Sequence, residues 1–248
     1  MEEIIQKVKN LSVGFKSQNG HEISILKNIT TNIKKGETVG IVGESGSGKS
    51  TLALAMMGYV KQGLYKIEGE CIFNSSNLLD MNNRELEKVR GRKIAMIPQN
   101  AGQSLTPNLK IGYQIDEALK LHTNLSKNER DKKISELLNK VRLPSPETIA
   151  LRYPHELSGG QQQRVAAARA MATKPEVIFA DEPSGNLDSK SSKELLTFMK
   201  SVVKELNQTI VMVTHDPFAA SFAERVIMLK DGEVASDMEE PSQEEIIS

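Results

Sequence analysis

The chain has 248 residues, and its 32 lysines and arginines balance 32 aspartates and glutamates. This length suits one large domain, or one domain with an inserted lobe, and the balanced charge gives no sign of a nucleic-acid-binding surface. The single Cys71 excludes a disulfide within the chain and is expected to be a reduced core thiol. The first residues are too polar for a signal peptide, and no apolar run approaches the roughly 20 residues of a membrane helix. We therefore expect a soluble, cytosolic protein.

The first third of the chain is expected to be rich in strands. The first 35 residues alternate apolar and polar side chains in short runs, which favours antiparallel strands. Residues 38–43, TVGIVG, are expected to form a short apolar strand that ends in glycine, and a helix follows over TLALAMMGYV. Residues 93–99, KIAMIPQ, are expected to form another strand, ended by Pro98.

The middle of the chain, from about 107 to 157, has a helical pattern. In DKKISELLNKV, the apolar residues Ile134, Leu137, Leu138 and Val141 recur at the spacing of one face of an amphipathic helix. The charges of KNERDKK are interpreted as the solvated face of that helix and not as a binding patch.

After residue 160, helices and strands alternate. We expect helices at 160–172, 191–206 and near 217–222, and strands at 176–181, 208–213, 225–229 and 233–235. This alternation implies a mostly parallel sheet with helices on both faces and a helical lobe inserted in the middle. Residues 1–240 are expected to form one domain, with the helical part at about 100–157, and residues 241–248 an acidic tail or terminal helix.

A phosphate-binding motif follows the first apolar strand. GESGSGKS (43–50) matches G-x-x-x-x-G-K-[ST], in which glycines turn successive backbone N–H groups toward phosphate oxygens and a helix N-terminus adds positive charge. Lys49 is expected to reach the β- and γ-phosphates of ATP, and the Ser50 hydroxyl to coordinate Mg²⁺. The candidate ATP-binding residues of this loop are Gly43, Glu44, Ser45, Gly46, Ser47, Gly48, Lys49, Ser50 and Thr51. Kinases, GTPases and motor ATPases all share the loop, so it does not name the reaction.

Two adjacent carboxylates follow the apolar strand VIFAD (177–181). Burying both without a partner would force one to keep its proton, whereas a bound cation would keep Asp181 ionised. Asp181 is therefore expected to face Mg²⁺, mainly through metal-bound water. Neighbouring strand residues point to opposite sides, so Glu182 lies where it could polarise the water that attacks the γ-phosphate.

LSGGQQQR (157–164) contains a second candidate anion site, at the start of an alanine-rich helix. Ser158 is a good N-cap, and the two glycines leave backbone N–H groups uncovered. A plain capping turn would explain the serine and the helix, but not the whole motif so shortly before a strand that ends in Asp-Glu.

With these motifs in this order, the chain resembles the nucleotide-binding subunits of ATP-binding cassette (ABC) transporters over essentially its whole length. The resemblance implies an α/β fold of the P-loop NTPase type, with a mostly parallel sheet core, an N-terminal antiparallel β subdomain and an inserted α-helical subdomain. It also implies ATP hydrolysis by two cassettes packed head to tail, with each ATP held between one subunit's phosphate loop and the other's LSGGQ. The LSGGQ residues that would contact the opposite subunit's ATP are Ser158, Gly159, Gly160 and Gln161.

The resemblance also gives roles to four further residues. Phe15 matches the aromatic residue that stacks on adenine, and Gln99 the glutamine that contacts the metal and couples to the membrane partner. Asp188, in GNLD, matches the aspartate of the loop that reaches the opposite subunit's ATP. His215 matches the switch histidine, which holds the γ-phosphate and the attacking water. Locally, Phe15 could equally be a core residue and His215 a structural histidine. The implied catalytic residues are Glu182, His215 and Gln99, and the implied Mg²⁺ ligands are Ser50, Gln99 and Asp181.

The cargo is less well defined than the reaction. Up to about residue 175, motifs such as SLTPNLKIGYQI and YPHELSGGQQQR resemble peptide, dipeptide and nickel importer ATPases. From FADEPSGNLDSK to the end, the chain resembles lipoprotein-release and macrolide-export ATPases instead. We favour import of peptides or metal complexes, because the permease-facing helical lobe lies in the importer-like part. A non-transport ATPase in a soluble enzyme complex is a further alternative.

The resemblance implies several protein partners. Expected are integral membrane permease subunits at the cytoplasmic face of the membrane and a second ABC ATPase subunit, identical or different. An importer would add a solute-binding protein, and no nucleic acid is expected.

Overall fold

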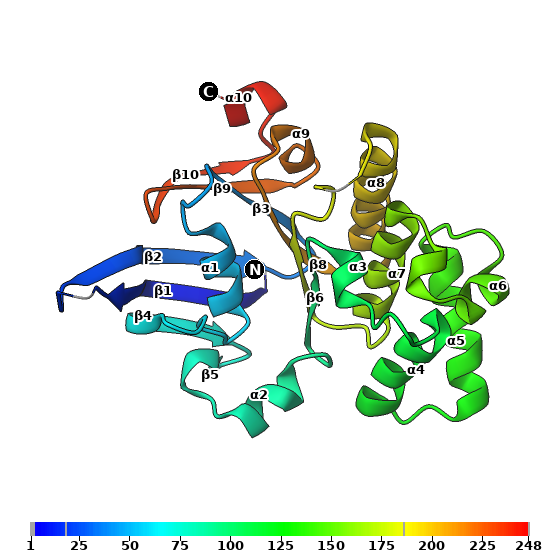
Figure 1. Cartoon of the computed structure of the whole chain (residues 1–248). Coiled ribbons are helices and arrows are strands. Elements are labelled where there is room, and N and C mark those ends of the chain that lie inside the picture. Colours follow the sequence, from blue (N-terminus) through cyan, green and yellow to red (C-terminus); the bar gives the residue numbers. More distant parts are fainter. Residues whose placement is uncertain (1–2, 18, 186, 248) are drawn as a thin grey trace. The chain divides into compact units, whose positions relative to one another are not determined.

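The computed structural model describes residues 3–17, 19–185 and 187–247, without the side chains of residues 202 and 204–206. Asn186 of the GNLD motif lies outside the described residues. The chain divides into two compact units, Met1–Glu87 with Val202–Ser248 and Lys88–Ser201. It passes from one unit to the other inside α2 (Asn83–Val89) and α8 (Ser189–Leu206). Figure 1 shows the elements in chain order by colour.

The first unit contains an antiparallel sheet near the N-terminus. Its strands β1 (Ile4–Lys16), β2 (Glu22–Lys34), β4 (Tyr65–Phe73) and β5 (Ser76–Asn77) pair in the order β2-β1-β4-β5. Leu11, Leu26, Ile29 and Ile33 are completely buried and form part of its core. The antiparallel strands predicted from the alternating pattern are therefore confirmed.

The rest of the first unit's sheet structure is mostly parallel. β3 (Thr38–Val42) lies between β8 (Thr209–Thr214) and β9 (Arg225–Lys230) and is parallel to both, and β10 (Glu233–Glu239) is antiparallel to β9. Every residue of β3 and β8 is buried, as expected for strands that are covered on both faces. β3 thereby holds the phosphate loop, which begins at its carboxyl end.

The helices of the first unit are short. They are α1 (Lys49–Met56), the 3-10 helix η1 (Leu78–Asp80), α9 (Pro217–Ala220) and α10 (Gln243–Ile247). α1 begins and ends earlier than the predicted TLALAMMGYV, because Gly48 and Gly58 both take positive φ values, of 99° and 73°, and bound the helix. The acidic C-terminal segment forms α10, and its Ile246 is buried against Val42, Ala220, Ala223 and Val226.

The second unit combines two parallel strands with the helical lobe. β6 (Ile94–Ile97) pairs with β7 (Val177–Asp181). The helices are α3 (Ala101–Ser104), α4 (Ile111–His122), α5 (Lys127–Lys140), α6 (Pro146–Leu151), the 3-10 helix η2 (Pro154–Glu156) and α7 (Gly159–Met171). α7 packs against β6, α3, α4 and α5, so the helix that follows LSGGQ is the central element of this unit (Figure 1).

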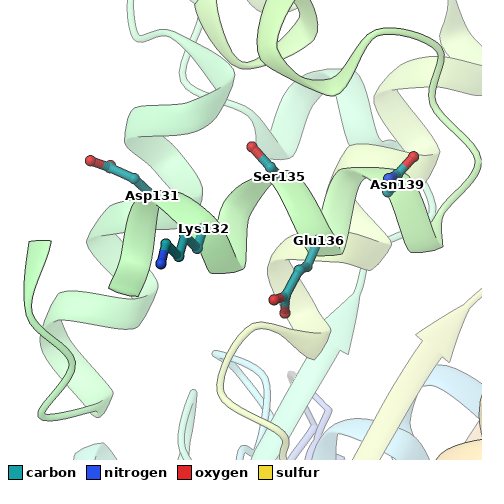
Figure 2. Close-up of a pocket in the computed structure, with 5 residues that line it drawn as sticks. All are labelled: Asp131, Lys132, Ser135, Glu136 and Asn139. Atoms are coloured by element: carbon teal, nitrogen blue, oxygen red, sulfur yellow. The ribbon is translucent and has the colours of Figure 1, made fainter. Parts of the chain in front are cut away.

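Helix α5 has the two faces predicted from its sequence. Ile134, Leu137 and Leu138 are buried, as is Val141 at its C-terminal end. The opposite face carries a shallow hollow, and Figure 2 shows that its lining residues all come from this one helix. They are Asp131, Lys132, Ser135, Glu136 and Asn139. A hollow between polar side chains of one helix fits a solvated face. Among the described residues, none of the helices is both long and apolar enough to cross a bilayer.

Candidate nucleotide-binding site

The phosphate loop is shaped by glycines that no other residue could replace without a shift. A Cβ at Gly43 would lie 2.1 Å from the Leu229 carbonyl oxygen, and one at Gly48 would lie 2.7 Å from Leu26 Cδ2. Gly46 has open space around it, but its φ of 86° lies in the left-handed region that favours glycine. The loop therefore packs tightly at both ends and exposes its middle, where Glu44, Ser45 and Gly46 are exposed.

Polar groups converge inside this loop. The Lys49 ammonium donates hydrogen bonds of 2.7 Å to the carbonyl oxygens of Gly43 and Glu44, and the residue is only 7% exposed. The Ser47 Oγ is buried and has no hydrogen-bond partner within the described chain. A buried hydroxyl without a partner is costly, so a ligand oxygen would satisfy it. Gly48, which caps α1, provides no side-chain hydrogen bond to the helix N-terminus.

These features fit the phosphates of ATP. A buried cation, an unsatisfied hydroxyl and an uncapped helix N-terminus all favour an anion. Ser50 is the first-turn hydroxyl of α1 and is exposed, and Thr51 beside it is half-buried. The described residues contain no group of three or more His, Cys, Asp or Glu side chains able to hold a metal. Mg²⁺ typically binds through one or two protein ligands together with waters and substrate phosphates, and the exposed Ser50 hydroxyl fits the role of one such ligand.

Two other candidates lie on the first unit. Phe15 is half-buried on β1, opposite Ile23 of β2. His215 directly follows β8 and is exposed. The residue after it is held in place, because Asp216 donates its N–H to Thr214 Oγ1 at 3.0 Å and accepts from Phe218 N–H at 2.9 Å. The histidine thus sits at the carboxyl end of a buried strand, between residues with fixed positions.

The two adjacent acids end β7 in the second unit. Asp181 is the last residue of the strand, and both Asp181 and Glu182 are half-buried. Glu182 has a φ of 45°, which is uncommon for a residue with a side chain. The Gly185 N–H donates to the Glu182 carbonyl at 3.0 Å and closes a turn. The strand therefore ends in a tight, strained reversal at the position of the predicted general base.

The structure brings Gln99 close to this turn. Gln99 is exposed and lies two residues after β6, which pairs with β7. A Cβ at Gly185 would lie 3.9 Å from Gln99 Nε2 and 3.5 Å from Glu182 Cβ. Glu182, Gly185 and Gln99 thus meet within the second unit, although 83 positions separate Gln99 from Glu182 in the sequence.

The LSGGQ segment forms the N-terminus of α7. Ser158 and Gln161 make a reciprocal capping box, in which Gln161 N–H donates to Ser158 Oγ at 3.3 Å and Ser158 N–H donates to Gln161 Oε1 at 3.1 Å. Gly159 is exposed and has no neighbour within 4 Å of a Cβ position, whereas a Cβ at Gly160 would lie 3.6 Å from Ser191 Oγ. The N-cap predicted for Ser158 is confirmed.

Asp188 has a local role that its sequence position did not reveal. Its carboxylate accepts hydrogen bonds from the N–H groups of Lys190 and Ser191, at 3.1 and 3.0 Å, and from Ser191 Oγ at 2.7 Å. These bonds, first those from Ser191, lower the pKa of Asp188. Asp188 therefore caps α8, and Ser191 lies beside Gly160 of the LSGGQ segment.

Two residues that sequence reasoning did not single out anchor the segment around Gln99, from Pro98 to Ser104. Gln163 and Arg169 of α7 hydrogen-bond to Pro98 and Ser104, 65 positions earlier in the chain. Only the run QQQR in the sequence indicated polar residues on an otherwise alanine-rich helix, and it could not name their partners.

A protein-family model described as "ABC transporter" matches residues 26–185. The chain belongs to the ABC transporter family. This match covers more than half of the ABC chain and includes the phosphate loop, Gln99, LSGGQ and the acids at the end of β7. It thus confirms the family that the motifs predicted.

Curated relatives of this ABC protein include peptide-transport ATP-binding proteins. OppD, an oligopeptide transport ATP-binding protein of Bacillus subtilis, is 38% identical over 92% of this chain and 64% of its own length. DppD, a dipeptide transport ATP-binding protein of Lactococcus lactis, is 39% identical over 94% of this chain and 67% of its own length. GsiA, a glutathione import ATP-binding protein of Escherichia coli, is 38% identical over 91% of this chain. The chain spans about two thirds of the first two relatives and 37% of the third.

Solved structures confirm the predicted ABC ATPase fold. A dimeric, post-hydrolysis structure of the ATP-binding cassette MJ0796 bound to ADP and Pi has a TM-score of 0.84 and 38% identity, over 96% of this chain and 99% of that one. CbiO1 from Clostridium perfringens, part of the ABC transporter complex cbiONQ, has a TM-score of 0.80 and 27% identity, over 96% of this chain and 90% of that one.

Proposed function

We propose that this chain is the ATP-hydrolysing subunit of an ABC transporter that imports small peptides. The observation that carries the ATPase part is the phosphate loop, in which the Lys49 ammonium and the unpartnered Ser47 hydroxyl are buried. Gly43 and Gly48 are packed so closely there that an added Cβ would lie 2.1 and 2.7 Å from its nearest neighbours. Import of peptides is supported by the relatives, which are ATP-binding proteins named for oligopeptide transport, dipeptide transport and glutathione import. Their alignments cover more than nine tenths of the chain, so they continue well past residue 175.

In this proposal the first unit's residues bind the nucleotide. Phe15 stacks on the adenine, and residues 43–51 hold the phosphates with their N–H groups and with Lys49. His215 holds the γ-phosphate and the attacking water by a hydrogen bond. Ser50 of the first unit and Asp181 and Gln99 of the second would be the protein ligands of Mg²⁺, which would supply positive charge to offset the negative charge on the phosphate oxygens.

Glu182 acts as the general base in this proposal. A carboxylate takes a proton from water only when it stands within hydrogen-bond reach of it and is itself ionised. Glu182 is half-buried in a strained turn beside Gln99, which supports a fixed position for the backbone that carries its side chain. The proton that leaves the attacking water passes to Glu182 Oε as the water oxygen bonds to phosphorus and ADP departs.

A second subunit completes each ATP site in this proposal. Ser158, Gly159, Gly160, Gln161 and Asp188 contact the ATP bound to the opposite subunit, and the pair is a homodimer or a heterodimer. The dimeric form of the MJ0796 cassette supports such a pair. The subunits act on integral membrane permeases at the cytoplasmic face of the membrane, with a solute-binding protein that delivers the peptide.

Purification from native membranes tests the transport part. The tagged chain is expected to copurify with integral membrane subunits and, after reconstitution in vesicles, to drive ATP-dependent uptake of labelled di- to pentapeptides. The matched control is Lys49→Ala, which should keep the complex and lose the uptake. Copurification with soluble enzymes alone, or peptide movement in the export direction only, would overturn this function.

A further inference from the structure

The three consecutive glutamines of LSGGQQQR have three different partners. Successive helix residues point about 100° apart, so Gln161, Gln162 and Gln163 face different directions at the start of α7. Gln161 completes the capping box with Ser158, and Gln162 Nε2 donates to the carbonyl oxygens of Pro154 and Leu157, at 2.8 and 3.2 Å. All of these bonds connect the first turn of α7 to the residues just before it. The third glutamine differs from them.

Gln163 reaches a distant part of the chain. Its Nε2 donates to the Pro98 carbonyl oxygen at 3.2 Å, and the residue is only 4% exposed. Pro98 has no N–H of its own and directly precedes Gln99. The side-chain amide of Gln163 therefore holds the peptide group that joins Pro98 to Gln99.

Arg169 holds the far end of the same segment. Its Nη1 donates to the Ser104 carbonyl oxygen at 3.0 Å, and its Nη2 lies 3.4 Å from Ser104 Oγ. Burial lowers the pKa of this guanidinium, so these bonds to Ser104 compensate for part of its lost hydration. Pro98 and Ser104 are six positions apart, as are Gln163 and Arg169 on the helix.

We propose that Gln163 is a positioning residue for Gln99 and links it to the LSGGQ segment at the start of the same helix. The proposal rests on the proposed function, because it takes Gln99 as a residue of the ATPase reaction. Gln99 lies beside the turn that Glu182 and Gly185 form. Holding Pro98 therefore keeps the Gln99 amide beside the Glu182 turn, and a movement of α7 carries the Gln99 segment with it.

A matched pair of glutamines makes the test specific. Gln114 is as buried as Gln163, at 3%, and makes three hydrogen bonds, to Thr106 N–H and to the carbonyl oxygens of Thr106 and Leu109. Gln114 belongs to the same unit as Gln163, but its hydrogen bonds go to Thr106 and Leu109 and not to the Gln99 segment, residues 98–104. Gln163→Met and Gln114→Met each replace a buried amide by an unbranched apolar chain of similar length, so both are expected to lose stability.

The first readout is amide hydrogen exchange in the full chain without nucleotide. Gln163→Met is expected to speed exchange about tenfold in residues 98–105, where Ser104 and Leu105 donate to Asn100 and Ala101. Gln114→Met is expected to speed exchange in residues 106–111 instead. Wild-type exchange rates in residues 98–105 of Gln163→Met would overturn the proposal.

The second readout is ATP hydrolysis at varied Mg²⁺ concentration. Gln163→Met is expected to lower kcat about fivefold or more and to raise the Mg²⁺ concentration for half-maximal rate, with KM for ATP nearly unchanged. In a Gln99→Ala background, Gln163→Met should add little further loss, since it acts through Gln99. Equal kcat losses in Gln163→Met and Gln114→Met, or full additivity with Gln99→Ala, would overturn the proposal. A wild-type chain without ATPase activity even in the presence of its membrane partners would instead refute the proposed function, while the exchange experiment still decides whether Gln163 holds the segment.

Discussion

At the scale of single residues, the conformation of Glu182 connects local strain to chemistry. A φ of 45° is energetically unfavourable for a residue with a side chain, and such strain persists only where the surrounding structure imposes it. Here the buried strand β7 leads into Glu182 and the Gly185 N–H closes the turn. The backbone of Glu182 therefore has a defined position from which its side chain extends, as the role of a general base requires.

Glu182→Gln should separate binding from hydrolysis. The amide is nearly the same size and keeps the turn, but it cannot accept the proton of the attacking water. We expect ATP affinity within about twofold of wild type and a kcat lower by about 100-fold or more, measured by nucleotide binding and phosphate release. Hydrolysis at the wild-type rate would contradict the role of Glu182.

Cys71 should be chemically inert in the folded chain. It is completely buried on β4, and this burial raises its pKa to about 12. An unfolded thiol has a pKa of about 8.5, so the native state favours the neutral thiol. Its contribution to stability is fully present below about pH 8.5 and is lost as pH rises toward 12.

Thiol labelling checks this. At pH 8 a maleimide or disulfide reagent should react with the native chain only through global unfolding, and rapidly in denaturant. Fast labelling of the native chain would contradict the burial. The Cys71→Ser variant is the control for reagent that reacts elsewhere.

At the scale of elements, helix termini carry both stability and candidate function. Ser158 caps α7 and Asp188 caps α8, and Gly160 lies beside Ser191, which donates to Asp188. The residues expected to reach across a dimer are therefore the same residues that begin two helices. A substitution at Asp188 must be interpreted with both roles in mind.

Asp188→Ala and Asp188→Asn separate these two roles. Asparagine still accepts the N–H bonds of Lys190 and Ser191, so it should keep most of the thermal stability, whereas alanine should lower Tm by a few degrees. Because the folded-state pKa of Asp188 is lowered, the charge contributes stability above its unfolded pKa, about 3.9, that is lost as pH falls through its folded pKa. The Tm difference between wild type and Asp188→Asn should accordingly fade in acid. Equal Tm values for the alanine variant and wild type at pH 7 would contradict the capping role.

Local patterns were sufficient to predict most elements. The alternation of the first 35 residues, the helical face of α5 and the N-cap Ser158 were all evident, because each depends on residues within one or two turns. The partners of Gln163 and Arg169 were not evident, since they lie 65 positions away and depend on how α7 packs on β6. The capping role of Asp188 does not follow from the GNLD motif, because it depends on hydrogen bonds from Lys190 and Ser191, which lie outside the motif.

At the scale of the whole molecule, the family membership and the dimeric cassette structures lead to a prediction about pairs of chains. If the phosphate loop of one subunit and the LSGGQ of the other act on the same ATP, a substitution in either motif should abolish hydrolysis by the homodimer. The two substitutions are Lys49→Ala in the phosphate loop and Ser158→Arg in LSGGQ. Mixing them should restore about a quarter of the wild-type rate, because half the dimers are mixed and one of their two sites is intact. No recovery on mixing would contradict sites shared between two copies of this chain.

The most direct test of the account is phosphate release from Mg·ATP by the purified full chain, compared with its Lys49→Ala variant. Lys49 is buried against the Gly43 and Glu44 carbonyls in the phosphate loop, and its removal takes away the ammonium group that the proposed function assigns to the phosphates of ATP. The wild-type chain should release phosphate at a measurable rate, and Lys49→Ala at about a hundredth of that rate or less. Equal rates of phosphate release for the two proteins would contradict ATP hydrolysis at this loop. No phosphate release by the wild-type chain, even with its membrane partners present, would also contradict it.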